Sequence, residues 1–140
     1  MGIPDELDAL LSEKPMGHIA SVKPDGQPHL VPVWIGYDGE HFLVAGRPNK
    51  QRHTNVKHEP RVALTVIDLS NPYSRSFSIQ GETESLTPDG ALEFLNQMSR
   101  QYFDIDEHPI TDSDRLLMRI RPTKIIDTSV DFDMAETESS

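Results

Sequence analysis

Residues 16–45 read MGHIASVKPDGQPHLVPVWIGYDGEHFLVA, and this stretch decides the fold of the chain. Residues 16–23, 27–35 and 41–45 are rich in the apolar and β-branched side chains that favour strands. The sequences PDG and YDGE lie between them and supply the chemistry of tight turns. The stretch therefore predicts a three-stranded antiparallel meander. Because proline cannot donate a ladder hydrogen bond, the prolines of the middle strand predict an edge, a bulge or an open side there.

Four further runs of the sequence are expected to be strands: residues 62–67, 75–84, 116–120 and 124–126. The first is a nearly continuous apolar run that is short enough for a buried strand. The second alternates, which puts Phe77 and Ile79 on one face of a half-buried strand. Pro122 separates the last two runs and is expected to break the strand at that point.

Three helices are expected between these strands. Residues 4–13 carry leucines at helical spacing and acids in the first turn. Residues 46–61 should contain one or two helical turns, with Asn49 as the N-cap. A third helix is expected to begin at Thr87 as N-cap, because Pro and Asp follow it. Its apolar positions recur at three- and four-residue spacing: Leu92, Leu95, Met98 and Tyr102.

The order of these elements predicts the fold class. Six or seven strands, mostly in hairpins, do not alternate regularly with helices, and this favours an antiparallel barrel over a Rossmann sheet. We expect a mainly β protein with short helices (α+β), built as a single domain over residues 1–128. Residues 104–114 are expected to form an acidic loop, and residues 129–140 an acidic, disordered tail.

The composition excludes several classes of function. The 140 residues carry a formal charge of −10 and no cysteine, so disulfides, thiolate chemistry and cysteine-bound zinc do not arise. The acidity disfavours nucleic acid and anionic membranes as partners, and no apolar run approaches the length of a membrane span. We expect a soluble, cytoplasmic protein. The acidity is compatible with a host of high internal salt and also with an ordinary acidic cytosolic protein.

One segment reverses this charge: residues 46–61, GRPNKQRHTNVKHEPR, which we call the basic segment. Its five basic residues against Glu59 alone give +4, which leaves −14 for the rest of the chain. Like charges repel unless something anionic lies among them, and a helix start adds free N–H groups and positive potential. The basic segment therefore indicates a phosphate site. The alternative from charge alone is a solvated basic helix that joins two strands.

Motifs for other chemistries are mostly absent. Neither G-x-G-x-x-G nor G-x-x-x-x-G-K-[ST] occurs, so neither nucleotide-binding loop applies. His53 and His58 lie five residues apart, off the spacing of a helical metal pair, so no metal site is predicted. No side chain has a clear claim to acid–base catalysis, and none is assigned. Trp34 and Tyr73 are expected in packing, with contact to a planar ligand as the alternative.

Several ordered segments of the chain resemble the pyridoxamine 5′-phosphate oxidase-like split β-barrels. GHIASVKPDGQPHLVPVW at 17–34 resembles the opening hairpin of that family, and NVKHEPRV at 55–62 resembles its K-x-x-N-L-x-x-D-P-R-V segment. Three further segments resemble the branch that uses the deazaflavin coenzyme F420: Asn71-Pro-Tyr73, Gly81 and residues 90–102. The resemblance spans residues 5–127.

The resemblance implies a six- to seven-stranded antiparallel split β-barrel that forms a homodimer, with two cofactor sites at the subunit interface. It implies F420 as the first-choice cofactor and FMN as the second, with the phosphate on the basic segment. The family's phosphate-binding lysine falls on Arg52. The implied cofactor-binding residues, three along the ring and six in the basic segment, are Pro32, Val33, Trp34, Gly46, Arg47, Lys50, Gln51, Arg52 and Asn55.

The resemblance also implies an activity. We expect an oxidoreductase that transfers a hydride between bound F420 or FMN and a small unsaturated organic substrate. The Arg- and Trp-containing motif that holds pyridoxamine phosphate in the true oxidases is missing, and Arg121-Pro122 matches it only faintly, so vitamin B6 oxidation is not expected. A non-catalytic flavin- or F420-binding carrier is the alternative. A structural dimer without ligand is a third interpretation, which the charge of the basic segment disfavours.

Overall fold

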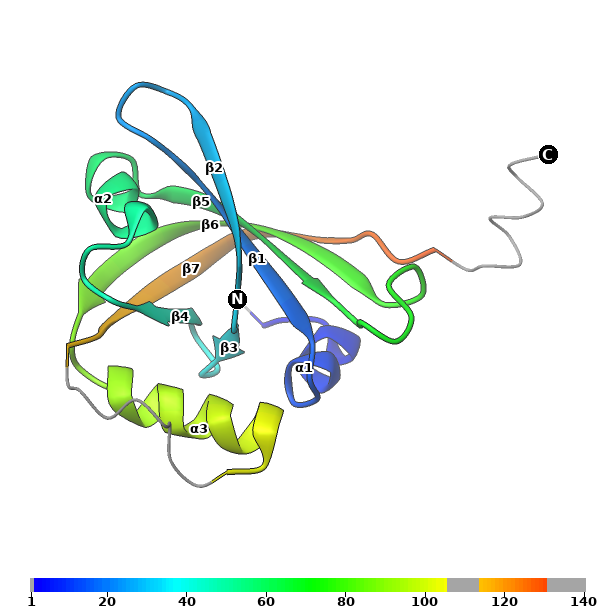
Figure 1. Cartoon of the computed structure of the whole chain (residues 1–140). Coiled ribbons are helices and arrows are strands. Elements are labelled where there is room, and N and C mark those ends of the chain that lie inside the picture. Colours follow the sequence, from blue (N-terminus) through cyan, green and yellow to red (C-terminus); the bar gives the residue numbers. More distant parts are fainter. Residues whose placement is uncertain (1, 106–113, 131–140) are drawn as a thin grey trace.

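The computed structural model describes residues 2–105 and 114–130, which form one curled antiparallel sheet and three short helices (Figure 1). The elements in chain order are α1 (Asp5–Leu11), β1 (Met16–Val22), β2 (Pro28–Val33), β3 (Gly36–Tyr37), β4 (Phe42–Gly46), α2 (Gln51–His58), β5 (Arg61–Ile67), β6 (Ser76–Thr87), α3 (Ala91–Phe103) and β7 (Leu116–Asp127). The predicted mainly β split barrel is confirmed. Most of the predicted acidic loop and tail lies outside the described residues.

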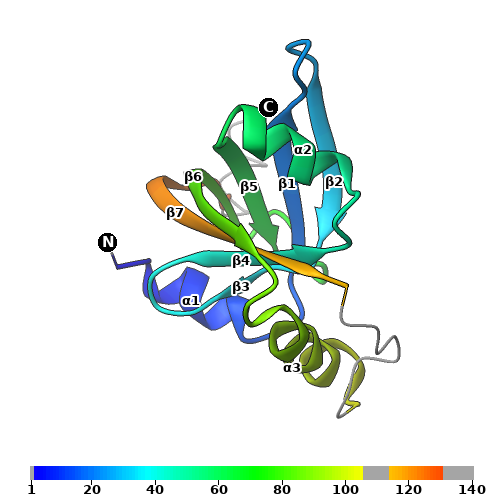
Figure 2. The ribbon, with the colours of Figure 1, turned by 90° about the vertical axis from the view of Figure 1, so that its left-hand side faces the viewer.

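The two edges of the sheet are close together in sequence. The strand order is β2-β1-β5-β6-β7-β4-β3, and only Trp34 and Ile35 separate β2 from β3. A sheet whose edges are joined by two residues must curl, and this gives the half-closed barrel seen in Figure 2. β2 contains Pro28 and Pro32 and lies at an edge of the sheet, which is the first of the three arrangements predicted for it.

The predicted meander of the first three strands is wrong. β4 pairs with β7, as in Leu43↔Arg119, and it does not pair with β2. The YDGE turn does make a hairpin, but this hairpin joins the two-residue β3 to β4. A tight turn specifies only the pairing of the two segments that it connects. The other side of β4 is paired by a strand near the far end of the chain, which local sequence cannot indicate.

β7 also differs from the prediction, because it runs through Pro122 without a break. Pro122 lies opposite Gly81, where the register of β6 and β7 shifts by one residue. The extra residue on β7 is Thr123, whose hydroxyl donates to the carbonyl of Gln80 at 3.2 Å. A bulge requires no ladder N–H from the proline, so the strand continues past it.

The third helix begins later than predicted. Thr87 is the last residue of β6, where it pairs with Leu117, and α3 begins at Ala91. The N-cap is Gly90, whose φ of 80° lies in the left-handed region that glycine favours. Pairing with β7 therefore extends β6 over the residues that look locally like a helix start. Leu95 and Met98 are buried as predicted, whereas Leu92 is 41 % exposed.

The core lies on the inner face of the curled sheet and includes Phe77 and Ile79, as predicted. α1 contributes Leu7, Leu10 and Leu11 at one end, whereas α2 packs against β1 at the other (Figure 2). A second cluster joins α3 to the sheet: Ala91, Phe94, Met98 and Leu117, with Trp34, Leu43, Ala45 and Tyr102 packed against it. No helix among the described residues is long and apolar enough to cross a membrane.

Candidate functional site

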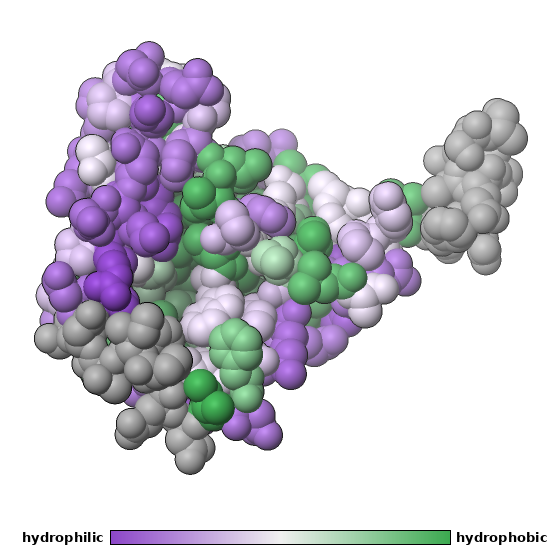
Figure 3. Space-filling model, in the orientation of Figure 1, coloured by the Kyte–Doolittle hydropathy of each residue, from purple (hydrophilic) through white to green (hydrophobic). Residues whose placement is uncertain are grey.

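A cavity of about 670 Å³ is lined by the basic segment and by residues of β2, β4 and α3. Cofactor sites commonly measure roughly 300–1,000 Å³, so a cofactor would fit. At one end the lining consists of Gly46 and four cations: Arg47, Lys50, Arg52 and Arg115. The rest is Lys14 and ten apolar or aromatic residues: Pro15, Met16, Pro32, Val33, Trp34, Ala45, Leu69, Phe94, Leu95 and Tyr102. Figure 3 shows hydrophilic surface on the α2 side and hydrophobic surface towards the centre of the same face.

The structure brings most of the predicted site residues together. Seven of the nine line this cavity: Pro32, Val33, Trp34, Gly46, Arg47, Lys50 and Arg52. Gln51 and Asn55 are not part of its lining. Gln51 Nε2 donates to Asn55 Oδ1 at 2.7 Å, and Asn55 Nδ2 donates to Ser21 Oγ at 3.0 Å. Asn55 is fully buried, so its amide holds α2 against β1 rather than facing a ligand.

The start of α2 differs from the prediction. Lys50 is the N-cap, in extended conformation and without a side-chain cap bond, so the proposed N-cap Asn49 is wrong. The preceding residues form a turn, in which the Lys50 N–H donates to the Arg47 carbonyl at 3.2 Å. This turn occupies Asn49 and delays the helix by one residue. Arg47 and Lys50 consequently lie on the turn that enters the helix, where both reach the cavity.

Arg52 is a buried cation without a buried anion. It is 8 % exposed and has no carboxylate partner in the described part of the chain. Its Nη2 donates to the Ala45 carbonyl at 2.9 Å, whereas its Nε has no partner among the described residues. Burial lowers the pKa of Arg52. Because an unpaired buried charge is unfavourable, an anion that enters the cavity would gain both charge and a free donor here.

Gly46 makes room for this guanidinium. A Cβ at Gly46 would lie 3.2 Å from Arg52 Cζ, and closer still to Nη2. It would also lie 3.4 Å from Cε1 of His53. The glycine therefore lets the arginine lie close along the end of β4, and any side chain at this position would displace it.

His53 shares this packing but offers no charge to the cavity. It is fully buried, and neither ring nitrogen has a hydrogen-bond partner among the described residues. Burial first, and the charge of Arg52 second, lower the pKa of His53 to about 4. The carbonyls of Arg47 and Pro48 act in the opposite direction, but neither reaches hydrogen-bonding geometry with the ring. His53 is therefore neutral at pH 7.

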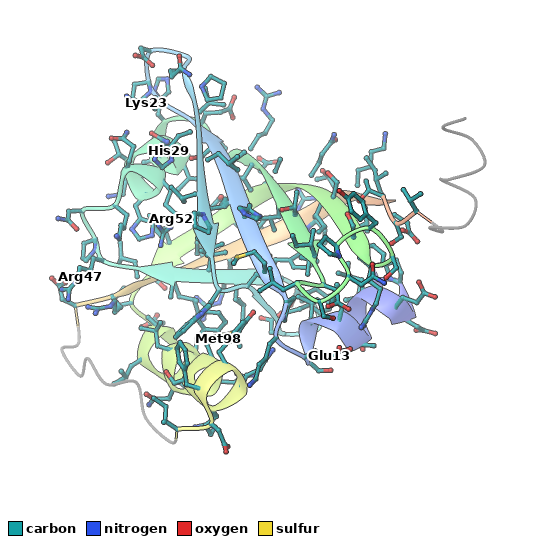
Figure 4. All side chains as sticks on the ribbon, turned by 45° about the vertical axis from the view of Figure 1, so that its right-hand side comes forward. Glu13, Lys23, His29, Arg47, Arg52 and Met98 are labelled. Carbon is teal, nitrogen blue, oxygen red and sulfur yellow. The ribbon has the colours of Figure 1, made fainter. Side chains whose placement is uncertain are left out.

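Four cations gather at one end of the cavity: Arg47, Lys50, Arg52 and Arg115. No Asp or Glu of the described ranges lines the cavity. Arg115 is 6 % exposed and lies outside the basic segment, so the charge pattern of the sequence did not indicate it. It reaches the site because the next residue, Leu116, pairs with Gly46. Figure 4 shows Arg47 and Arg52 on the same side of the molecule.

An aromatic wall from α3 completes the cavity. The ring of Trp34 stacks on Tyr102 at 5.4 Å between centroids and 13° between planes, and Phe103 lies at 5.6 Å. The Tyr102 hydroxyl donates to the Pro15 carbonyl at 2.5 Å, and burial raises the pKa of Tyr102 to about 12. Trp34 therefore packs against α3 and also lines the cavity. Tyr73, by contrast, is 67 % exposed.

A basic end without acids among the described residues, next to an apolar and partly aromatic wall, suits a ligand with a phosphate and a planar ring. The size of the cavity is in the range of cofactor sites. The model of the pyridoxamine 5′-phosphate oxidase family matches residues 3–129, and the chain belongs to that family. The resemblance read from the sequence is thereby confirmed.

Solved structures give the same fold. An F420 reductase is 33 % identical, with a TM-score of 0.77, over 89 % of this chain and 98 % of that chain. A conserved hypothetical protein from Mycobacterium tuberculosis is 22 % identical, with a TM-score of 0.67, over 88 % and 82 % of the two chains. HutZ, the heme storage protein from Vibrio cholerae, is 16 % identical, with a TM-score of 0.68, over 91 % and 95 %. The last two show the fold alone. No curated protein matches the chain.

Proposed function

We propose that this protein is an oxidoreductase that transfers a hydride between bound F420 and a small unsaturated organic substrate, with FMN as the second choice of cofactor. The observation that carries the proposal is Arg52, a buried guanidinium whose Nε lacks a partner among the described residues. It lines a cavity together with three other cations at the same end. Similarity to an F420 reductase favours F420 over FMN.

Different residues of the cavity would bind different parts of the cofactor. Arg47, Lys50 and Arg52 would hold the phosphate through charge-assisted hydrogen bonds. The strand from Pro32 to Trp34 would lie along the ring system. The bound cofactor supplies the hydride and its electron pair. The chain supplies binding and orientation, which is the usual share of a protein in cofactor chemistry.

The proton that accompanies the hydride has no evident donor on the cavity wall. The described lining contains no Asp, Glu, His, Cys, Ser or Thr. Tyr102 has its hydroxyl bound to the Pro15 carbonyl and its pKa raised to about 12, so it is a poor acid. When one carbon of a C=C bond accepts the hydride, the other must take a proton, and we assign that proton to water. The C=C bond is then reduced and the cofactor oxidised.

The same observation favours a second candidate function. A cavity whose described lining has no Asp, Glu or His suits a protein that binds a flavin or F420 and carries it without reaction. The oxidoreductase and the carrier would use Arg52 in the same way, because both must bind the phosphate of the cofactor. They differ in what happens to the reduced cofactor when an electron acceptor is added.

Binding and turnover together test the proposal. The purified chain should retain the absorbance of F420, or failing that of FMN, after incubation with each cofactor and desalting. The reduced, bound cofactor should then be reoxidised rapidly and saturably by enones or quinones. Retention without turnover across a broad panel of acceptors would favour the carrier. Retention of neither cofactor would contradict the proposed site.

We also propose that the protein forms a homodimer through the outer face of the sheet, with the cofactor sites at the interface. Two rows of cross-strand neighbours cross this face without a carboxylate: Leu30, Ala20, Ala63 and Gln80, and beside them Pro32, His18, Thr65, Ser78 and Ile126. Rows free of acids on a chain of charge −10 leave a region where two copies would not repel each other. Pro32 also lines the cavity, so the cavity borders this face.

Leu30→Glu should convert the dimer to a monomer. Leu30 is 66 % exposed at the edge of the proposed interface, and a carboxylate there would be buried without a partner. Light scattering at micromolar concentration measures the result. Leu92→Glu on α3, where the leucine is 41 % exposed, is the matched control and should stay dimeric. A wild-type chain that is a stable monomer would contradict the dimer.

A further inference from the structure

We infer that the cavity has a second anion site at Lys14, which binds the carboxylate of an acidic organic substrate. Lys14 lies between α1 and β1, outside the basic segment, and it lines the cavity. The inference rests on the proposed function, because it names the class of substrate that the same cavity would take. Neither the charge pattern of the sequence nor the family match points to this residue.

Lys14 lies at the end of the cavity remote from Arg52. Arg52 donates to the Ala45 carbonyl, and Ala45 pairs with Leu117, which lies against Gly90 at the start of α3. Tyr102, at the other end of α3, donates to the Pro15 carbonyl, and the eleven residues from Ala91 to Tyr102 span about 16 Å along a helix. A single phosphate cannot contact both ends, so a ligand at Lys14 needs an anionic group of its own.

The charge of Lys14 is not neutralised by its surroundings. The adjacent acid, Glu13, is bound by Arg75 through both carboxylate oxygens, at 3.0 and 2.7 Å. This bond to Arg75 lowers the pKa of Glu13, so the carboxylate stays ionised and engaged with the arginine. Lys14 has no ion pair or hydrogen bond with any described residue. Its ammonium group is therefore available to an anion in the cavity.

The lining around Lys14 restricts the kind of anion. Its neighbours on the cavity wall are apolar or aromatic: Pro15, Met16, Leu69 and Tyr102. An apolar or aromatic body would pack against these side chains while its carboxylate reaches the ammonium group. A phosphate would find one cation here, against four at the other end. A single carboxylate on a hydrophobic body is the better match to one lysine.

Binding of trans-cinnamate and its neutral amide, trans-cinnamamide, to the full chain tests this inference. Saturating inorganic phosphate occupies the basic end during the titration. Trp34 is the only tryptophan and lines the cavity, so quenching of its fluorescence reports occupancy. Cinnamate should bind about 5-fold more tightly than cinnamamide, as a solvent-accessible ion pair allows. Lys14→Ala should remove this preference and leave cinnamamide binding unchanged, whereas Lys14→Arg should retain it.

Matched variants separate a site at Lys14 from other causes. Lys23→Ala removes the same charge at the turn after β1, which Figure 4 shows at the opposite end of the molecule from Glu13, and should change nothing. A preference for cinnamate that survives Lys14→Ala would overturn the inference. The inference would also be overturned if Arg52→Ala removes the preference for cinnamate and Lys14→Ala does not. Weaker binding of F420 alone in Lys14→Ala, with the cinnamate preference intact, would assign the lysine to the cofactor instead and overturn it too.

Failure of this inference is distinguishable from failure of the proposed function. The fluorescence titration needs neither cofactor nor turnover, so its result stands even if neither F420 nor FMN binds. In a turnover assay, Lys14→Ala should raise the KM for a carboxylate-bearing enone about 5-fold and leave the KM for its methyl ester unchanged. If the wild type reduces both acceptors with equal KM, hydride transfer holds and the carboxylate site is wrong.

Discussion

Arg52→Ala is expected to weaken binding of the phosphorylated cofactor by roughly 10- to 100-fold. The guanidinium is buried, and its Nη2 donates to the Ala45 carbonyl. Its Nε has no partner among the described residues and can donate to a ligand. A charge-assisted hydrogen bond contributes about 1.5–3 kcal/mol, and about 1.4 kcal/mol is a tenfold change in affinity. Arg52→Lys should lose much less, because the ammonium group keeps the charge although it lacks the fork.

Titration of F420 and FMN into each variant, followed by absorbance, measures this effect. Arg61→Ala is the matched control, because its side chain is 79 % exposed, pairs with Glu59 at 2.5 Å and does not line the cavity. The melting temperature without cofactor should not fall in Arg52→Ala, since removing an unpaired buried cation costs little. If the dissociation constants for both cofactors are unchanged, the basic segment does not bind the phosphate and the site assignment is wrong.

Acid should destabilise the fold through His53, by about 2 kcal/mol between pH 7 and pH 5. Burial lowers the pKa of His53 to about 4 in the folded chain, below its usual value of 6.5. As the pH falls below 6.5, His53 becomes protonated in the unfolded chain, whereas in the folded chain it stays neutral until about pH 4. The contribution to stability is therefore complete above pH 6.5, declines as the pH falls, and levels off near pH 4.

Urea denaturation of the cofactor-free chain at pH 7, 6 and 5 measures this decline. His53→Phe should flatten the dependence in this range, whatever it does to stability at pH 7. His58→Asn changes an exposed histidine of the same helix and should leave the dependence as in the wild type. If His53→Phe declines as steeply as the wild type, the buried ring is not the group that makes the fold sensitive to acid.

Local features of the sequence predicted the strands and turns of the fold well, but not its pairing. Alternation placed Phe77 and Ile79 correctly in the core, and prolines placed β2 correctly at an edge. The pairing of β4 with β7 was missed because nothing near β4 specifies a partner so distant in the sequence. The same long-range pairing changed the end of β6, since Thr87 gains a partner in Leu117 instead of capping a helix.

The sequence predicted only those cations of the candidate site that lie close together along the chain. Arg52 stood out as part of a basic run in an acidic chain, and the structure places it on the cavity. Arg115 and Lys14 are single basic residues in separate parts of the sequence, and only the assembled barrel brings them to the cavity wall. Asn55 was predicted to bind the cofactor, but its side chain is hydrogen-bonded to Ser21 in the interior. The sequence cannot distinguish the two roles, because both require a polar side chain.

The two prolines of β2 and the shortness of β3 together protect the sheet from uncontrolled growth. An open sheet edge is a template on which another extended chain can add, and repeated addition leads to aggregates. β2 interrupts its row of donors at Pro28 and Pro32, and β3 offers a row of only two residues. Both ends of the strand order are therefore poor templates, although the barrel stays open. The proposed face-to-face dimer is complete with two copies, whereas edge-to-edge addition of strands has no such limit.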